Sequence, residues 1–144
     1  MSAHDPAPLR VAICDDDPAF RDLLRRVLRD HVEVVGAAGS PEEALEVTRE
    51  TQPDALLLDV LLGTRTAIET LPQLLVAAPR TMVAALTGLD AEDWEADVLV
   101  AGAFVFYEKT SALHLAQLLR DDVTLFRRAL EGEDVLAPSA LGRR

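Results

Sequence analysis

The chain has 144 residues, of which 49% are apolar and 27% are charged, a composition typical of one globular domain with a single core. Its formal net charge of −11 disfavours direct binding to DNA or RNA. Cys14 is the only cysteine, which excludes an internal disulfide and a multi-cysteine zinc site. Residues 1–10 lack the apolar core of a signal peptide, and no apolar run is long enough for a membrane span. We therefore expect a cytoplasmic protein that contacts neither a membrane nor nucleic acid directly.

Short apolar runs recur along the chain at a nearly constant interval. Each is too short for a helix, is rich in Val, Leu, Ile or Ala, and shows little polar alternation, a pattern typical of strands buried on both faces. The runs cover residues 9–14, 32–38, 55–58, 82–86 and 103–107.

Segments with the apolar spacing of helices separate these runs. Asp17-Pro18 predicts the first helix start, because it combines an N-cap with proline at the first helical position. Ser40-Pro41-Glu42-Glu43 is a capping box for the second, and Asp90 with Asp93 is a weaker start signal for the fourth. The interval between strands is about 20–27 residues, the length of a strand–helix repeat. The sequence therefore predicts the α/β class, with a doubly wound parallel sheet of five strands and helices on both faces.

Polar side chains follow the ends of the predicted strands. The first run ends in Asp15-Asp16-Asp17, the third in Asp59 and the fourth in Thr87, and the fifth is followed by Glu108-Lys109. In an open α/β sheet the carboxyl ends of the strands form the site. We therefore expect three carboxylates, a hydroxyl and the only lysine of the chain to meet at one edge.

This predicted cluster has the chemistry of a magnesium site that takes part in phosphoryl transfer. Two carboxylates about 4 Å apart repel by about 4 kcal/mol at an effective dielectric constant near 20. Mg²⁺ removes this cost, since it prefers carboxylate, phosphate and water oxygens, and Asp15, Asp16 and Asp59 fit that requirement. Asp59 is the natural nucleophile; Lys109 would pair with it or with an anion attached to it, and Thr87 would donate a hydrogen bond to that anion. Asp17 by itself is better explained as a helix cap than as a ligand.

Lys109 is unusual in composition as well as in position. The 14 basic residues are 13 arginines and this one lysine. An ammonium kept where arginine is used everywhere else indicates a need for a compact point charge, although a leftover solvated lysine is the simpler alternative.

Four segments together resemble the receiver domain of two-component response regulators, from about Leu9 to Arg120 or further. They are Val11-Ala12-Ile13-Cys14-Asp15-Asp16-Asp17-Pro18, Pro53-Asp54-Ala55-Leu56-Leu57-Leu58-Asp59, Ala84-Ala85-Leu86-Thr87-Gly88, and Ala101-Gly102-Ala103 leading to Phe106 and Lys109. The resemblance implies a flavodoxin-like fold with strand order 2-1-3-4-5. It also implies a signalling switch that is phosphorylated on Asp59 by a histidine kinase or phosphotransfer protein. Its only catalysis would be self-phosphotransfer and slow autodephosphorylation.

The resemblance also assigns roles to individual positions. Asp15 and Asp16 correspond to the acidic pair that binds Mg²⁺, and the backbone carbonyl of Leu61 to a further ligand. Thr87 corresponds to the switch hydroxyl and Phe106 to the aromatic rotamer switch. Lys109 corresponds to the lysine that pairs with the phosphoryl group.

Some positions depart from the family pattern. Gly63 and Ala67 replace a proline and a glycine after the acceptor, so we expect residues 61–66 to be mobile or differently shaped. Thr110 replaces the proline that commonly follows the lysine, as in receivers that precede a LuxR-type helix-turn-helix. Leu61 and Leu89 occupy the two positions that tune dephosphorylation, and neither side chain can orient water, so we expect a long-lived phosphoryl group.

The predicted organisation is a disordered segment over residues 1–8, a receiver over 9–131, and a tail or truncated linker over 132–144. No helix-turn-helix follows before Arg144, which leaves a stand-alone receiver or the loss of an effector domain.

Two surfaces are candidates for partners. Arg21, Arg25 and Arg29 form a basic stripe on the first helix, either a solvated face or a kinase-docking edge. The last helix, from Ala112, carries more apolar residues than a core-facing stripe needs, so we expect Leu113 to Leu130 to contact a second copy or another protein. Trp94 either flanks that surface or packs in the core.

Three other functions compete with the switch. A haloacid-dehalogenase-type phosphatase would use Asp15 as nucleophile, but Ala19 stands where that pattern expects Thr or Val. A flavodoxin would need a phosphate-cradling loop, which Asp15-Asp16-Asp17 would repel. A receiver-like binding module that works without phosphorylation stays open because of the altered loop at Gly63.

Overall fold

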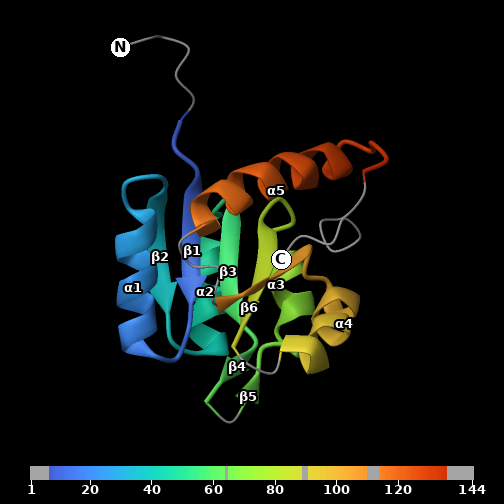
Figure 1. Cartoon of the computed structure of the whole chain (residues 1–144). Coiled ribbons are helices and arrows are strands. Elements are labelled where there is room, and N and C mark those ends of the chain that lie inside the picture. The colour runs from blue at the N-terminus through green and yellow to red at the C-terminus, as the bar shows by residue number, and fades with distance from the viewer. Residues whose placement is uncertain (1–6, 64, 89–90, 110–113, 136–144) are drawn as a thin grey trace.

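The main sheet consists of parallel strands at positions close to the predicted runs. They are β1 (Arg10–Cys14), β2 (Glu33–Ala38), β3 (Ala55–Asp59), β6 (Met82–Thr87) and β7 (Val105–Glu108). The computed structural model describes residues 7–63, 65–88, 91–109 and 114–135, with the backbone alone at 65 and 91–93. The strands lie in the order β2-β1-β3-β6-β7, which confirms the predicted order 2-1-3-4-5 and the flavodoxin-like class (Figure 1).

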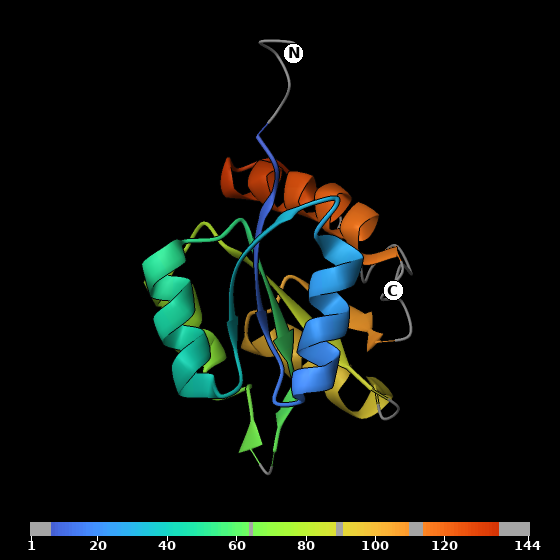
Figure 2. The same ribbon diagram turned by 90° about the vertical axis from the view of Figure 1, so that its left-hand side faces the viewer.

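Helices connect the strands and cover both faces of the sheet. They are α1 (Pro18–Leu28), α2 (Pro41–Thr51), α3 (Leu71–Ala77), α4 (Ala91–Ala101) and α5 (Leu115–Leu130). Successive residues of a strand point to opposite faces, so Val11 and Ile13 join one core cluster while Ala12 and Cys14 join the other. The first cluster packs against α1 and α5 and the second against α2, α3 and α4. Figure 2 shows α1 and α2 on opposite sides of the sheet.

Hydrogen bonds confirm the predicted starts of the first two helices, whereas Asp90 and the Asp93 side chain, the start signal for the fourth, lie outside the described residues. The Asp17 carboxylate accepts the Ala19 N–H at 3.0 Å, and Pro18 is the first residue of α1. The Ser40 hydroxyl accepts the Glu43 N–H at 3.2 Å and caps α2. These caps fix where each helix leaves the sheet, and the first one also fixes the loop that carries Asp15 and Asp16.

A small hairpin follows β3, and the sequence pattern does not predict it. Strands β4 (Leu61–Leu62) and β5 (Arg65–Thr66) pair antiparallel. Gly63 has φ +66°, which a glycine adopts without strain. Two-residue strands are too short to produce a readable period. The mobility or altered shape expected for residues 61–66 stays a prediction.

Helix α5 begins on the face covered by α1 and crosses the sheet edge at which the strands begin (Figure 2). Arg127 pairs with Asp54, the residue before β3, at 2.7 Å, and Arg120 donates to the His31 carbonyl at 2.8 Å. The helix ends at Leu130, close to the predicted boundary at 131. Ala112 and Leu113, which were predicted to belong to this helix, lie outside the described residues. Residues 1–6 and 136–144 at the two ends of the chain lie outside them as well.

Most apolar side chains of α5 pack against the core of this chain. Leu115, Leu119 and Val123 are buried, and Leu118 and Phe126 pack against the same core cluster. The Phe126 ring lies edge-on to Phe104, with 5.3 Å between centroids. Core packing thus accounts for most of the side chains that suggested a partner surface on this helix.

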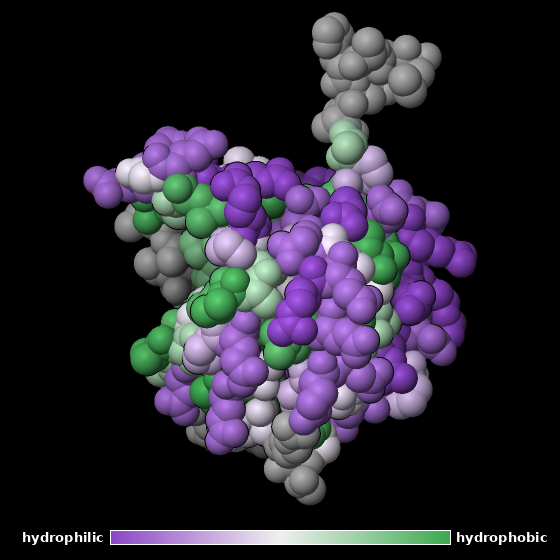
Figure 3. Space-filling model, turned by 180° about the vertical axis from the view of Figure 1, so that it is seen from behind, coloured by the Kyte–Doolittle hydropathy of each residue, from purple (hydrophilic) through white to green (hydrophobic). Residues whose placement is uncertain are grey.

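Few large apolar side chains elsewhere reach solvent. Among the residues whose burial is defined, Val76 of α3 and Val100 of α4 are the most exposed, at 83% and 88%. The face opposite to the view of Figure 1 is mainly hydrophilic, with scattered apolar residues (Figure 3). No helix in the described ranges is long and apolar enough to cross a bilayer.

Candidate functional site

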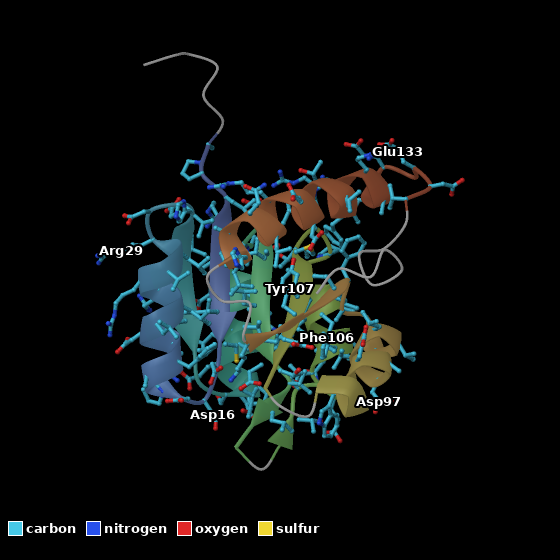
Figure 4. The ribbon with its side chains drawn as sticks, viewed as in Figure 1. Asp16, Arg29, Asp97, Phe106, Tyr107 and Glu133 are labelled. Atoms are coloured by element: carbon cyan, nitrogen blue, oxygen red, sulfur yellow. The ribbon has the colours of Figure 1, made fainter. Side chains whose placement is uncertain are left out.

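The predicted carboxylates meet at the carboxyl ends of the central strands. Asp15, Asp16 and Asp59 each offer an oxygen, and these oxygens all lie within 4.8 Å of one another. Asp15 follows β1 and is fully buried, Asp59 is the last residue of β3 and is 5% exposed, and Asp16 is exposed. Figure 4 shows Asp16 at the sheet end near the β4–β5 hairpin. Three hard oxygen donors in this arrangement fit a divalent cation such as Mg²⁺.

Lys109 reaches this cluster from the end of β7. Its Nζ donates to Asp59 Oδ2 at 3.1 Å, as predicted, and to Asp15 Oδ2 at 2.7 Å, which was not predicted. The same Nζ lies 4.4 Å from the centroid of the Phe20 ring, on the first turns of α1. The lysine thus joins the ends of β1, β3 and β7 and the start of α1.

Backbone N–H groups hold the carboxylates in place. Asp15 Oδ1 accepts the Asp17 N–H at 2.9 Å, and Asp59 Oδ1 accepts the Leu61 N–H at 3.2 Å. Asp16 Oδ2 accepts the Gly63 N–H at 2.9 Å. The hairpin after β3 is therefore tied to the acidic loop after β1, a link that the sequence pattern did not reveal. The role of the Leu61 carbonyl as a metal ligand remains a prediction.

Burial and charge shift the acid–base behaviour of the site. Burial, together with the nearby charge of Asp15, raises the pKa of Asp59 to about 6, although Lys109 and the Leu61 N–H oppose the shift. For Lys109 burial lowers the pKa, but hydrogen bonds and charges from Asp15 and Asp59 outweigh it and the pKa is raised. Burial also raises the pKa of the Cys14 thiol to about 12, so this cysteine is not a nucleophile at neutral pH.

The raised pKa of Asp59 predicts a pH-dependent effect of Asp59→Asn on stability when metal is absent. The folded protein binds this proton more tightly than the unfolded chain. Protonation of Asp59 therefore stabilises the fold fully below pH 3.8, the ordinary pKa of this carboxyl group. This stabilisation is lost as the pH rises through about 6. Asparagine is neutral at every pH, so we expect it to raise the free energy of unfolding by about 1–2 kcal/mol near pH 7.5 and to change it little near pH 4. Denaturant titrations in a chelator measure both values, and an equal change at the two pH values would contradict the assignment.

The Thr87 hydroxyl is buried at the carboxyl end of the sheet. Thr87 is the last residue of β6, and its Oγ1 is buried without a hydrogen-bond partner among the described residues. Leu86, the residue before Thr87, pairs in register with Asp59 on the adjacent strand β3. A buried hydroxyl without a partner costs about 1–3 kcal/mol, a cost that a hydrogen bond to a bound group would remove.

Phe106 and Tyr107 lie on opposite faces of β7 (Figure 4). The Phe106 ring is buried in the core cluster next to α4, and Trp94 packs against that same cluster. This confirms the core alternative for Trp94. The switching role predicted for Phe106 is not tested by a single conformation.

Arg21, the first residue of the predicted basic stripe on α1, has a partner within the chain. Its Nη1 donates to the backbone carbonyl of Asp15 at 2.6 Å, so the side chain folds back onto the acidic loop. Arg25 and Arg29 are exposed, as a solvated face or a docking edge requires. The four-residue spacing gave no sign of this difference, because a carbonyl partner in a loop leaves no sequence pattern.

The comparisons with known proteins agree with this geometry. The family model for the response regulator receiver domain matches residues 11–120, so the chain belongs to the receiver domain family of response regulators. Response regulator MprA from Mycobacterium ulcerans (strain Agy99) is 34% identical over 131 residues, which cover 91% of this chain and 56% of MprA. Response regulator GacA from Pseudomonas viridiflava is 33% identical over 115 residues, which cover 78% of this chain and 54% of GacA. The chain spans about half the length of these curated relatives.

Solved structures show the same architecture. The signal receiver domain of the response regulator NarL from Mycobacterium tuberculosis has a TM-score of 0.75 and 27% identity, and the match covers 83% of this chain and 98% of that domain. A CheY-like receiver domain protein from Methanospirillum hungatei JF-1 has a TM-score of 0.76 at 21% identity, covering 85% of this chain and 99% of that protein. The second likeness concerns the fold alone.

Proposed function

We propose that this chain is a phosphorylation-dependent switch of a two-component system. In this proposal Asp59 accepts a phosphoryl group from the phosphohistidine of a histidine kinase or a phosphotransfer protein. The observation that carries it is the convergence of Asp15, Asp16, Asp59 and Lys109 at the carboxyl ends of the strands. The buried Thr87 hydroxyl at the end of β6, which has no partner among the described residues, supports it. A cytoplasmic location is part of the same proposal.

The chain's own residues supply most of the chemistry. An Asp59 oxygen attacks phosphorus and forms an O–P bond, while the P–N bond to histidine breaks and its electron pair stays on the imidazole nitrogen. Lys109 already lies at Asp59 Oδ2 and would pair with the new phosphoryl oxygens, and the Thr87 hydroxyl would donate to them. Asp15, Asp16, Asp59 and the Leu61 carbonyl would hold Mg²⁺. The chemistry that the ion supplies there is neutralisation of charge on the phosphoryl oxygens.

The output we propose is a change in protein binding. Phosphorylation adds negative charge beside Thr87 and Lys109, and their movement would bias the position of Phe106 in β7. Partners would be a second copy or another protein contacting the outer side of α5, where Leu130 is 41% exposed. Direct contact with nucleic acid is not part of the proposal for this segment.

A second candidate is a binding module that does not depend on phosphorylation. One observation favours it: the Gly63 N–H already occupies Asp16 Oδ2 within the β4–β5 hairpin, so a cation would have to share this carboxylate. A phosphatase with Asp15 as nucleophile is less well supported, because Asp15 is fully buried and already accepts bonds from Lys109 and the Asp17 N–H.

Beryllofluoride, a phosphoryl mimic, separates the two candidates. We expect beryllofluoride with Mg²⁺ to change the fluorescence of Trp94, which packs against the core cluster of Phe106, and Asp59→Asn to abolish the change. No change in the unsubstituted protein favours the module that works without phosphorylation. The same change in the Asp59→Asn variant would contradict Asp59 as the acceptor.

The phosphoryl group on Asp59 is expected to be long-lived. The Leu61 side chain is 45% exposed beside Asp59 and has no group that can orient water for attack. Leu89, the second such position, lies outside the described residues. We expect a Leu61→Asn, Leu89→Glu variant to lose the phosphoryl group about tenfold faster, since a positioned polar group assists water attack. Loss of label after removal of the phosphodonor measures both rates, and equal rates would refute this expectation.

A further inference from the structure

The Lys109 ammonium has a third neighbour besides the two carboxylates. Its Nζ lies 4.4 Å from the centroid of the Phe20 ring, within the range in which a cation is attracted to an aromatic face. Asp15 and Asp59 contact the same Nζ at 2.7 Å and 3.1 Å. The lysine side chain is 26% exposed, so the protein covers most of its surface.

The backbone fixes Phe20 firmly relative to the acidic loop. Pro18 and the Asp17 cap set the first turn of α1 directly after the aspartates. Arg21, the next residue, donates to the Asp15 carbonyl at 2.6 Å and ties the second turn to the same loop. The Phe20 ring also packs against the core cluster beneath α1. Three features therefore fix the position of Phe20 beside Lys109: the Asp17 cap, the Arg21 hydrogen bond and packing against the core.

We propose that Phe20 is a positioning residue for phosphoryl transfer, acting through the ammonium group of Lys109. This inference rests on the proposed function of Asp59. The negative face of the ring holds the ammonium where it meets both Asp59 and the incoming phosphoryl group, and limits its hydration. Phe20 touches neither reactant in this account, so its effect passes through Lys109 alone.

The competing explanation is that Phe20 is only a core residue of the right volume. The two explanations differ in what they require of the ring. Core packing requires shape and apolar surface, whereas a cation contact requires electron density on the ring face. Substituting hydrogen by fluorine on the ring removes that electron density with little change in shape.

The test is a series in which residue 20 is phenylalanine, then its mono-, di- and trifluorinated analogues. The measurement is the rate of Asp59 phosphorylation at saturating acetyl phosphate and Mg²⁺. We expect the rate to fall stepwise with fluorine content, by about fivefold across the series, the factor that about 1 kcal/mol of cation–aromatic attraction corresponds to. The matched control is trifluorophenylalanine at Phe104, whose ring contacts Phe126; it should leave the rate unchanged.

A spectroscopic readout checks the contact without any phosphodonor. We expect the ε-methylene protons of Lys109 to resonate upfield because of the Phe20 ring current, to lose this shift in Phe20→Leu, and to keep it in Phe20→Trp. A phosphorylation rate independent of fluorine content, or unshifted lysine protons in the unsubstituted protein, would overturn the inference alone. Failure of the unsubstituted protein to be phosphorylated would overturn the proposed function, and this inference with it.

Discussion

Replacing Lys109 with methionine is expected to slow phosphorylation of Asp59 by at least about 100-fold, the usual loss when one donor to a developing oxyanion is removed. Methionine keeps the length and apolar stem of lysine but removes the charge that contacts Asp15 and Asp59. The phosphoryl oxygens would then develop charge beside the carboxylates without the ammonium. Rates of label uptake from acetyl phosphate with Mg²⁺ measure the effect.

Lys109→Arg is the matched control, since it keeps the charge but changes its shape. The ammonium lies between two carboxylates and a ring, 4.4 Å from the ring centroid, and a planar guanidinium does not reproduce those contacts. We expect an intermediate rate, about tenfold below the unsubstituted protein. A methionine variant that is phosphorylated as fast as the original would show that Lys109 has no part in the reaction.

Tyr107→Phe is expected to lower the free energy of unfolding by about 1–3 kcal/mol, the usual cost of leaving a buried acceptor short of a donor. The Tyr107 hydroxyl donates to Asp122 Oδ2 at 2.5 Å, and the Asp122 carboxylate on α5 is fully buried. The variant removes the hydroxyl that donates to Asp122 and keeps the aromatic ring. Urea denaturation at neutral pH measures the loss.

Asp122→Asn is the control for this pair, because its side-chain carbonyl still accepts the Tyr107 hydroxyl. We expect Asn to destabilise less than Tyr107→Phe does. A Tyr107→Phe protein as stable as the original would mean that Asp122 is satisfied without the phenol. Helix α5 would then be held mainly by its apolar residues.

The strands and the side chains at their ends were predictable, because buried parallel strands appear in the sequence as continuous apolar runs. Such a run cannot contain an aspartate unless the carboxylate has partners, so Asp59 marked the end of its strand. Strand order brought Asp15, Asp59 and Lys109 together without any knowledge of the loops.

The contacts that refine the site were not predictable, because they depend on loop and rotamer geometry. The Gly63 N–H that holds Asp16 comes from a hairpin of two-residue strands. The folding back of Arg21 depends on a backbone carbonyl, and the contact of Phe20 with Lys109 depends on where β7 ends relative to α1. None of these partners has a fixed sequence separation from its target, so no spacing rule could find them.

The last helix also shows that the sequence pattern does not identify which element contacts an apolar side chain. Counting apolar residues predicted that part of α5 contacts a partner, and this stays a prediction. The count could not show that Phe104 receives Phe126 or that the core receives Leu118. The number of apolar residues on a helix says how much surface must be covered and not by which element.

Intact-mass spectrometry after treatment with acetyl phosphate is the most direct test of Asp59 as the residue that accepts the phosphoryl group. We expect the unsubstituted protein to gain one phosphoryl group when Mg²⁺ is present, on the peptide that contains Asp59, and a chelator or Asp59→Asn to prevent the gain. Label on Asp15, label that persists in Asp59→Asn, or an unsubstituted protein that stays unlabelled would contradict it.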